Sequence, residues 1–352
     1  MRLNIVVIPK SGLGTEITTQ SIKVLKAIAL EFDHKFIFKT VDTNSRNRSL
    51  NKDIDLCRNN DAILTSNESF LQNRNLHSEL KVHASSTIVK SYNSLTINSP
   101  LERKVISGTN ILFFNELNLT NDVTKKYSSK NNDYAYDINE NTRQEIQCVA
   151  KKAFKAAQSR GKKVTLIITS DISQVSSLWT EIASKLSLQY PEIKFNVINI
   201  ENAVTQLILS PNLFDVILTE RIISNILIKQ SSVLTGSTSL QSTSYLGQKT
   251  SLFFPTVHSN VDVTDCKNPN PLASILSAAM LLEHFRLYSE SEMIKTAINR
   301  SLELNITTPD LNLTYNNITT NKVGDFIADF ITNPHDSNAN FKNIHLGQST
   351  II

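Results

Sequence analysis

Residues 214–232 read FDVILTERIISNILIKQSS and contain a strand followed directly by a helix. The apolar run FDVIL predicts a buried strand. After it, apolar residues recur at positions i, i+1, i+4 and i+5, a spacing that places them on one face of a helix. Asn225 and Lys229 occupy another side of that helix, one turn apart. The stretch therefore predicts a strand–helix unit that presents an amide and an ammonium group together.

The same alternation of strands and helices extends in both directions along the chain. Further strands are predicted at residues 3–8, 36–41, 61–64, 110–114, 164–168 and 194–200, and helices at residues 15–30, 142–161, 175–188, 272–286 and 324–331. A capping box formed by Thr142 and Glu145 marks the start of one helix. Residues 66–80 are polar and are predicted to be a loop, and residues 125–141, polar with several tyrosines, are predicted to be an exposed excursion. This alternation indicates an α/β fold class.

The composition argues against several classes of protein. The chain has 352 residues, enough for two domains or one large one, and 40% of them are hydrophobic. Its net charge of +4 is not gathered with aromatic residues on one basic face, so nucleic acid is not an expected partner. The apolar stretches are too short to cross a bilayer, and no signal peptide is recognisable. The three cysteines lack metal-binding spacing, so we expect a cytoplasmic protein without a membrane partner.

Glycine is unusually rare, at 8 of 352 residues, against about 7% in ordinary proteins. Enzymes of the α/β class need glycine where the backbone approaches a phosphate group or where φ must be positive. An AT-biased genome and release from active-site constraints would both lower the glycine content, and the composition does not separate these two explanations.

Seven stretches form an ordered set along the chain: VIPKSGLGTEIT, SPLERKV, SSLWTEIASKLSLQYPEI, ENAVTQLILSPNLFDVILTE, SVLTGSTSLQSTSYLG, NPLASILSAAMLLEH and VGDFIADFI. Together they resemble the 3-isopropylmalate dehydrogenase family, β-decarboxylating enzymes related to isocitrate dehydrogenase. The resemblance implies a three-layer α/β/α fold of the isocitrate/isopropylmalate dehydrogenase type with two domains. Residues 1–99 and 252–352 would form the cofactor-side domain, and residues 100–251 the dimerisation domain beyond the cleft.

In that family three aspartates hold Mg²⁺ or Mn²⁺, cations that prefer carboxylate oxygens. The matching positions here are Glu201, Asn225 and Lys229. An amide and an ammonium cannot replace two carboxylates, so the resemblance implies that Mg²⁺ and Mn²⁺ are not bound as catalytic ions. Two interpretations of Lys229 stay open: its ammonium replaces the metal charge and pairs with Glu201, or it is a solvated surface lysine.

The family holds its substrate carboxylates with three arginines, whose planar guanidinium groups suit bidentate binding. The matching positions here are His77, Thr87 and Asn115. Lys90 and Arg74 are candidate replacements nearby in the sequence, although a lysine does not reproduce the guanidinium geometry. His77 is interpreted as a surface or loop histidine.

The family uses a lysine and a tyrosine for general acid–base chemistry. The lysine position matches Thr169, with Asp171 where an asparagine is usual, and the tyrosine position falls near Asp122. Three tyrosines are conceivable substitutes for the missing one: Tyr127, Tyr134 and Tyr136. No catalytic position of the family is therefore intact.

The dinucleotide loop of the family matches FPTVHSNVD and the following NPNP. Asp262, at the adenosine-ribose position, and Asn270 are retained. Phe254, Val257 and His258 replace the family's glutamate, histidine and glycine. The retained pair is interpreted either as a remnant of an NAD site or as turn and helix-capping residues. NAD therefore remains a possible ligand.

We expect an impaired or inactive relative of 3-isopropylmalate dehydrogenase that serves as a structural, regulatory or binding protein. Its expected partner is a second copy or an active paralogue. The argument is that catalytic positions are replaced together while the core segments stay apolar. One alternative is an NAD-dependent oxidoreductase with an altered substrate, drawing on Glu201, Lys229, Asp171 and His77. The other is a small-ligand sensor that uses the interdomain cleft.

Overall fold

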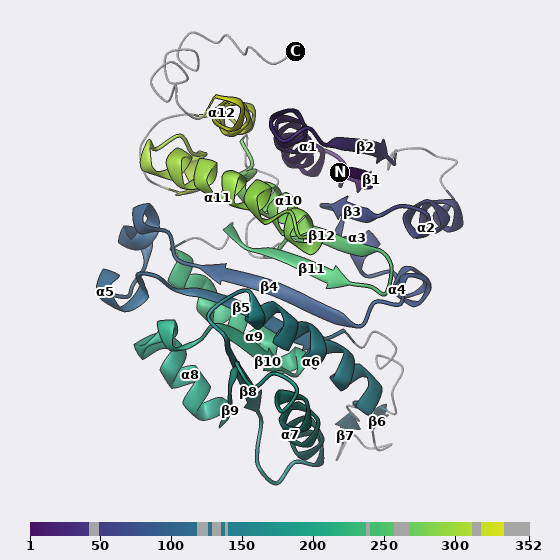
Figure 1. The fold of residues 1–352 in the computed structure, drawn as a ribbon, viewed down its shortest axis with the longest axis vertical. Coiled ribbons are helices and arrows are strands. Elements are labelled where there is room, and N and C mark those ends of the chain that lie inside the picture. The colour runs from purple at the N-terminus through teal and green to yellow at the C-terminus, as the bar shows by residue number, and fades with distance from the viewer. Residues whose placement is uncertain are drawn as a thin grey trace.

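The computed structural model describes residues 1–41, 49–117, 126–128, 135–137, 140–236, 240–256, 268–311 and 318–333. Ten strands form one sheet in the order β2-β1-β3-β12-β11-β4-β5-β10-β8-β9 (Figure 1). They are β1 Arg2–Ile8, β2 Lys35–Thr40, β3 Ala62–Thr65, β4 Ala84–Lys90, β5 Asn110–Glu116, β8 Lys163–Ile168, β9 Lys194–Asn199, β10 Val216–Thr219, β11 Ser242–Leu246 and β12 Ser251–Pro255. Strands β6 Lys126–Ser128 and β7 Ala135–Asp137 pair separately.

The helices of the described residues connect most of these strands. They are α1 Leu13–Glu31, α2 Leu50–Arg58, α3 Glu68–Leu71, α4 Arg74–Leu80, α5 Arg103–Ile106, α6 Arg143–Gln158, α7 Gln174–Ser187, α8 Ile200–Leu209, α9 Arg221–Ser231, α10 Leu272–His284, α11 Tyr288–Glu303 and α12 Thr320–Thr332. Short 3₁₀ segments include η1 Asn93–Asn98 and η4 Ser232–Thr235. Among the described helices, none is both long and apolar enough to cross a membrane.

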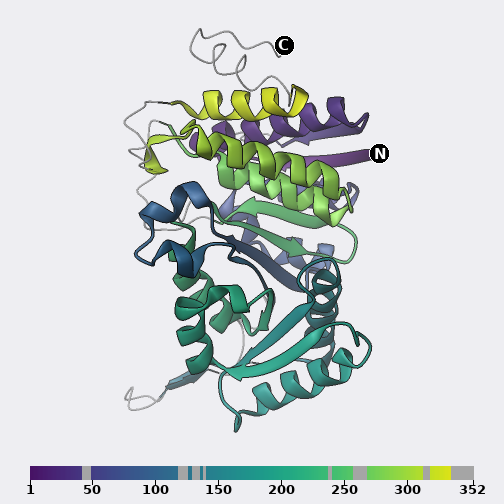
Figure 2. The ribbon, with the colours of Figure 1, turned by 60° about the vertical axis from the view of Figure 1, so that its left-hand side comes forward.

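The middle of the sheet is antiparallel, and its two ends are parallel. Strand β4 runs antiparallel to both β5 and β11, and β11 runs antiparallel to β12. All other pairs in this sheet are parallel. Successive parallel strands need a crossover, and helices supply most of these crossovers. Figure 1 shows α6, α7, α8 and α9 around one end of the long sheet. Figure 2 shows α1, α10, α11 and α12 grouped at the other end.

Helices cover both faces of the sheet and produce three layers. On the first face, α1, α10, α11 and α12 pack on one apolar cluster, and α6 and α7 pack on another. On the second face, α2, α3 and α4 share one cluster, and α8 and α9 share the other. In β1, Leu3, Ile5 and Val7 contact the first face while Val6 and Ile8 contact the second. A strand buried on both faces is apolar without alternation, which explains the run LNIVVI.

The structure confirms the α/β class and the three-layer arrangement. All predicted strands and helices are present, and the capping box of Thr142 and Glu145 forms at the start of α6. Strands β4, β11 and β12 were not predicted, and in β4 and β11 serine and threonine interrupt the apolar pattern. Most of the predicted excursion at residues 125–141 lies outside the described residues. The domain boundaries near residues 99 and 252 stay a prediction.

The prediction of a loop at residues 66–80 is wrong. This segment forms α3 and α4, each started by an asparagine side chain that accepts a backbone N–H. Asn67 accepts from Phe70 at 3.2 Å, and Asn73 accepts from Leu76 at 3.0 Å. Phe70 and Leu76 then enter the apolar cluster of the second face. The polar composition hid these helices, because each is too short to show a full helical period.

Candidate active site

A strip of polar side chains crosses the second face of the sheet between its two apolar clusters. Thr87 on β4 lies opposite Thr243 on β11 in the strand register, and its Oγ1 lies 2.8 Å from that of Thr243. Asn115 on β5 lies opposite Ser85, which in turn lies opposite Tyr245. Side chains directly opposite one another point to the same face, so two of the three arginine-matched positions share this strip.

The strip is electrically neutral and bonded within itself. The Thr243 hydroxyl lies 2.6 Å from that of Thr256, which extends the chain of hydroxyls from Thr87. Asn115 donates from Nδ2 to the carbonyl oxygen of Glu116 at 2.7 Å. Thr87 and Asn115 are both buried. Each of them makes a hydrogen bond within the protein, and neither carries a charge that a ligand carboxylate could pair with.

The interpretation of His77 as a surface or loop residue is wrong. It lies in α4 with 5% of its surface exposed, and its ring contacts that of Tyr245 at 5.5 Å between centroids. Nε2 donates to the carbonyl oxygen of Leu71 at 2.5 Å, while Nδ1 is buried with no hydrogen-bond partner among the described residues. Burial lowers the pKa of His77, and the bond to Leu71 opposes this shift. The neutral imidazole cannot replace an arginine as an anion anchor.

Lys90 does not compensate for the missing arginines. Side chains alternate between faces along a strand, and Val89 packs in the cluster beneath α8 and α9. Lys90 therefore points to the first face, where its ammonium lies 5.5 Å from the centre of the Tyr92 ring. Arg74 begins α4, one turn before His77, and is exposed. Arg74 stays a candidate replacement because it lies near a family arginine position in the sequence. Its side chain is exposed, however, whereas Thr87 and Asn115 are buried.

The metal-matched positions lie on α8 and α9. These helices pack together through an apolar cluster that includes Ala203, Leu207 and Leu227. Glu201, in the first turn of α8, and Asn225 and Lys229, on α9, are exposed. Across the described ranges, no three His, Cys, Asp or Glu side chains come together as a group that could hold a metal ion. The ion pair between Glu201 and Lys229 stays a prediction.

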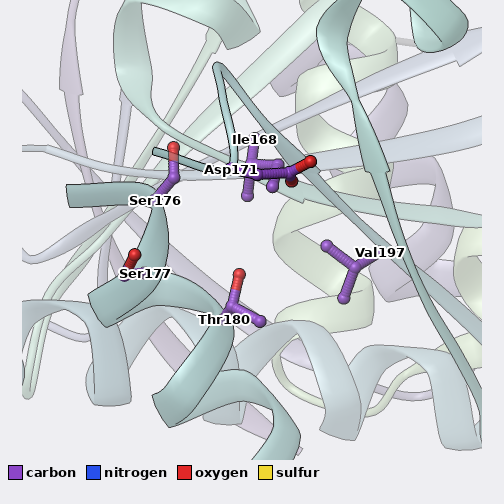
Figure 3. A pocket seen from close by; sticks show the side chains of 6 residues that line it. All are labelled: Ile168, Asp171, Ser176, Ser177, Thr180 and Val197. Atoms are coloured by element: carbon purple, nitrogen blue, oxygen red, sulfur yellow. The ribbon is translucent and has the colours of Figure 1, made fainter. Parts of the chain in front are cut away.

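The lysine-matched residue Thr169 follows β8. It is exposed, and its Oγ1 lies 3.0 Å from Oγ of Ser176 in the first turn of α7. Beside it is an open hollow of about 300 Å³ (Figure 3). The hollow is lined by Ile168, Asp171, Ser176, Ser177, Thr180 and Val197. Asp122 and Tyr134 lie outside the described residues, and Tyr127 is paired with Tyr136 in the strand register of β6 and β7.

The dinucleotide-loop residues are described only in part. Asp262, Val257 and His258 lie outside the described residues, and Phe254 is a buried residue of β12. Asn270 lies just before α10, and its Oδ1 accepts the backbone N–H of Leu272, the first residue of the helix, at 2.9 Å. Its Nδ2 donates to Asp310 at 3.0 Å. Both ends of the Asn270 amide are thus used structurally, which supports the capping interpretation.

Sequence reasoning missed two buried carboxyl groups beside the polar strip. Glu116 ends β5 with 4% exposure, and both of its oxygens accept the backbone N–H of Arg221 at 2.9 and 3.1 Å. Glu220, which follows the neighbouring strand β10, is also buried. Burial raises the pKa of Glu116 to about 7 and raises that of Glu220. The only sequence signal was an acidic residue at the end of each apolar strand.

Comparison with known proteins now identifies the family. The model of the isocitrate/isopropylmalate dehydrogenase family matches residues 4–327. The chain belongs to this family. It is 30% identical to a 3-isopropylmalate dehydrogenase from Bacteroides fragilis over 94% of the chain and 99% of that protein. It is 32% identical to one from Priestia megaterium, over 88% and 91% of the respective lengths.

Solved structures of the isocitrate/isopropylmalate dehydrogenase family share the fold. An isocitrate dehydrogenase from Methylococcus capsulatus superposes with a TM-score of 0.78 at 22% identity, covering 94% of this chain and 99% of that one. A β-decarboxylating dehydrogenase from Thermococcus kodakarensis gives 0.76 at 22% identity, covering 94% and 96%. At this identity the likeness concerns the fold, and function has to be argued from the site.

The residues present do not fit the catalytic cation that the family resemblance implies. Mg²⁺ and Mn²⁺ need several hard oxygen ligands, and Lys229 would place a positive charge among them. Glu201 alone is a carboxylate at these positions. No step through a bound metal is therefore derived for this family member.

Glu116 makes stability depend on pH in a specific direction. Its pKa is near 4.5 in the unfolded chain and about 7 in the fold, so the folded state holds an extra proton between these values. The stabilisation from this proton is complete below about pH 4.5 and is lost as pH rises through 7. We expect the free energy of unfolding to fall by about 3 kcal/mol across this range because of Glu116.

Urea unfolding of wild type and Glu116→Gln between pH 5 and 8 measures this effect. The glutamine variant should lose most of this pH dependence, because it stays neutral throughout. Glu31→Gln, an exposed residue at the end of α1, serves as the control and should retain the wild-type slope. Equal slopes for wild type and Glu116→Gln would contradict the assignment.

Proposed function

We propose that this family member does not catalyse oxidative decarboxylation and works as a binding or regulatory protein on the dehydrogenase scaffold. The carrying observation is the polar strip, where Thr87 and Asn115 are buried, uncharged and bonded within the protein. The metal positions Asn225 and Lys229 add to it, since one is an amide and the other a cation. The substrate positions and the metal positions lie on different strands and helices. The first set lacks the arginines and the second lacks the aspartates that the family uses.

Electrostatics near the strip support the proposal. The relatives are named for 3-isopropylmalate, a dicarboxylate, and two carboxylates need concentrated positive charge or many donors. Thr87 and Asn115 of the strip carry no charge, and Glu116 and Glu220 bring acidic groups to the ends of β5 and β10, beside one cation, Arg221. When these two groups ionise, they repel an anionic substrate. Binding of a dicarboxylate in the family's orientation is therefore unfavourable here.

The scaffold itself is retained. Helix α10 contributes ten buried residues of its thirteen, and its neighbours α1, α11 and α12 pack on the same cluster. The catalytic residues of the family are replaced, while the apolar core is retained. This combination indicates that selection still maintains a folded protein, which would act through binding. Cys57 and Cys148 are free thiols, as expected in a reducing compartment, and a cytoplasmic location is part of the proposal.

Calorimetric titration with NAD, Mg²⁺ and 3-isopropylmalate, singly and together, tests the proposal. We expect no binding of 3-isopropylmalate or Mg²⁺ and no increase when all three are combined. Heat from NAD alone would mean that the loop containing Asp262 still binds the nucleotide, which would favour a sensor. Cooperative binding of the three ligands would refute the proposal.

We further propose that a second copy of the chain, or an active paralogue, covers the outer side of α8 and α9. Five large aliphatic residues are exposed on these helices and the segment between them: Ile208, Leu209, Leu213, Ile222 and Ile226. Monomeric proteins rarely expose apolar side chains in such concentration. Association through this surface would bury them.

A dimer is the expected form in sedimentation equilibrium. Replacing Ile222 and Ile226 with lysine should shift the protein to monomer, because four ammonium groups would enter a two-fold interface. Leu30→Lys places one such charge per chain on an exposed leucine of α1 and should leave the dimer intact. A monomeric wild type would exclude the homodimer and leave the paralogue as the candidate partner.

A further inference from the structure

We infer that the hollow beside β8 and α7 is a binding site for a small primary alkylammonium ion. The hollow has a volume of about 300 Å³ and opens to solvent at the end of the sheet formed by β8 and β9. This volume is at the lower end of the range for small-ligand pockets. The inference rests on the hollow and its lining, and it does not depend on whether the chain retains dehydrogenase activity.

The lining supplies acceptors and one negative charge. Asp171 is the only ionisable residue among the six that line the hollow, and its carboxylate makes no hydrogen bond or ion pair with the described residues. Ser177 donates its hydroxyl hydrogen to the carbonyl oxygen of Ser173 at 3.0 Å, so its oxygen keeps lone pairs to accept with. The Thr180 hydroxyl points into the hollow (Figure 3). An ammonium group has three N–H donors and no acceptor, which matches this arrangement.

Two of the residues that line the hollow are apolar. Val197 comes from the edge strand β9 and points into the hollow, and Ile168 ends β8 (Figure 3). Val197 is 37% exposed, so a ligand could cover it further. A short alkyl chain attached to the ammonium would gain from this contact by removing apolar surface from water. The ligand class is therefore an aliphatic amine in its protonated form rather than a bare inorganic cation.

An anion is the main competing occupant, since the hollow adjoins the first turns of α7 and helix N-termini favour negative charge. Two observations argue against it. Ser173 already caps α7 by accepting the backbone N–H of Ser176 at 3.4 Å. Asp171 precedes this cap by two residues, so its carboxylate lies in the segment that leads into the helix and would repel a second anion.

Methyl NMR of the full chain, titrated with butylammonium chloride, tests the inference. We expect saturable shifts at Ile168 and Val197 with a dissociation constant in the millimolar range. Methylammonium should bind at least about threefold more weakly, because it lacks the apolar chain. Sodium butyrate and sodium chloride at equal ionic strength should produce no saturable shift at these methyl groups.

Two variants separate the contributions of charge and apolar surface. Asp171→Asn should weaken butylammonium binding about fivefold, as expected for a partly solvated ion pair. Glu192→Gln removes an equal charge from an exposed site outside the hollow and should leave binding unchanged. Val197→Thr should reduce the difference between butylammonium and methylammonium.

Several outcomes would overturn the inference. Unchanged binding in Asp171→Asn, equal weakening in both carboxyl variants, or the absence of saturable shifts in the wild type would each do so. Tighter binding of butyrate than of butylammonium would mean that the hollow is an anion site instead.

Discussion

No NADH formation is expected when the protein is mixed with 3-isopropylmalate, NAD and Mg²⁺ at saturating concentrations. A general acid or base contributes about 10²–10⁴ in rate, and the lysine-matched residue here is Thr169, whose hydroxyl bonds to Ser176. The substrate anchors and metal ligands are replaced as well. Such losses are not additive, but together they should lower turnover at least about 10⁶-fold below an ordinary enzyme of 1–10³ s⁻¹.

Absorbance at 340 nm over hours, with a 3-isopropylmalate dehydrogenase as positive control, measures this turnover. The double variant Asn225→Asp/Lys229→Asp should remain inactive, because it restores two carboxylates but neither the substrate anchors nor the acid–base pair. Turnover by the wild-type chain that responds to Mg²⁺ and is lost in Glu201→Gln would contradict the proposed function.

Much of the fold could be predicted from the sequence, because buried parallel strands and amphipathic helices leave strong patterns. The run LNIVVI and the helix containing Ile223 and Leu227 are examples, and both appear where expected. Strands β4 and β11 failed for a physical reason. They cross the middle of the sheet, where one face is lined with Ser85, Thr87 and Thr243 instead of aliphatic residues. Strands are predicted from their apolar residues, so a strand is missed where polar residues of a candidate site replace those apolar residues.

The sequence names candidate site positions, but it does not show the environment of their side chains. The family resemblance located His77 and Lys90 near the substrate positions, yet it could not show that His77 is buried or that Lys90 points to the opposite face. Burial of His77 depends on its ring contact with Tyr245, which lies far from it in the sequence. Glu116 was missed for the same reason, since its role comes from Arg221, more than a hundred residues away. Side-chain environment is a property of tertiary packing.

The largest effect on stability is expected from Gly236→Ala. Gly236 has a φ of 66°, a left-handed conformation that costs other residues about 1–2 kcal/mol. A Cβ atom there would also lie 2.2 Å from the carbonyl oxygen of Leu95, a contact that cannot exist without a backbone shift. Leu95 is fully buried in η1, so the shift would disturb the core. We expect a loss of about 3 kcal/mol or more in the free energy of unfolding.

Gly108→Ala is the matched control for this prediction. Gly108 also has a positive φ, of 80°, but its Cβ would meet no atom within 4 Å. Its variant should therefore lose only the conformational part, about 1–2 kcal/mol. Urea unfolding of both variants gives the difference, which isolates the contact with Leu95. In a chain with only 8 glycines among 352 residues, a large difference would mean that Gly236 is kept because the backbone beside η1 leaves no room for a side chain. Equal losses in the two variants would show instead that only its φ is under constraint.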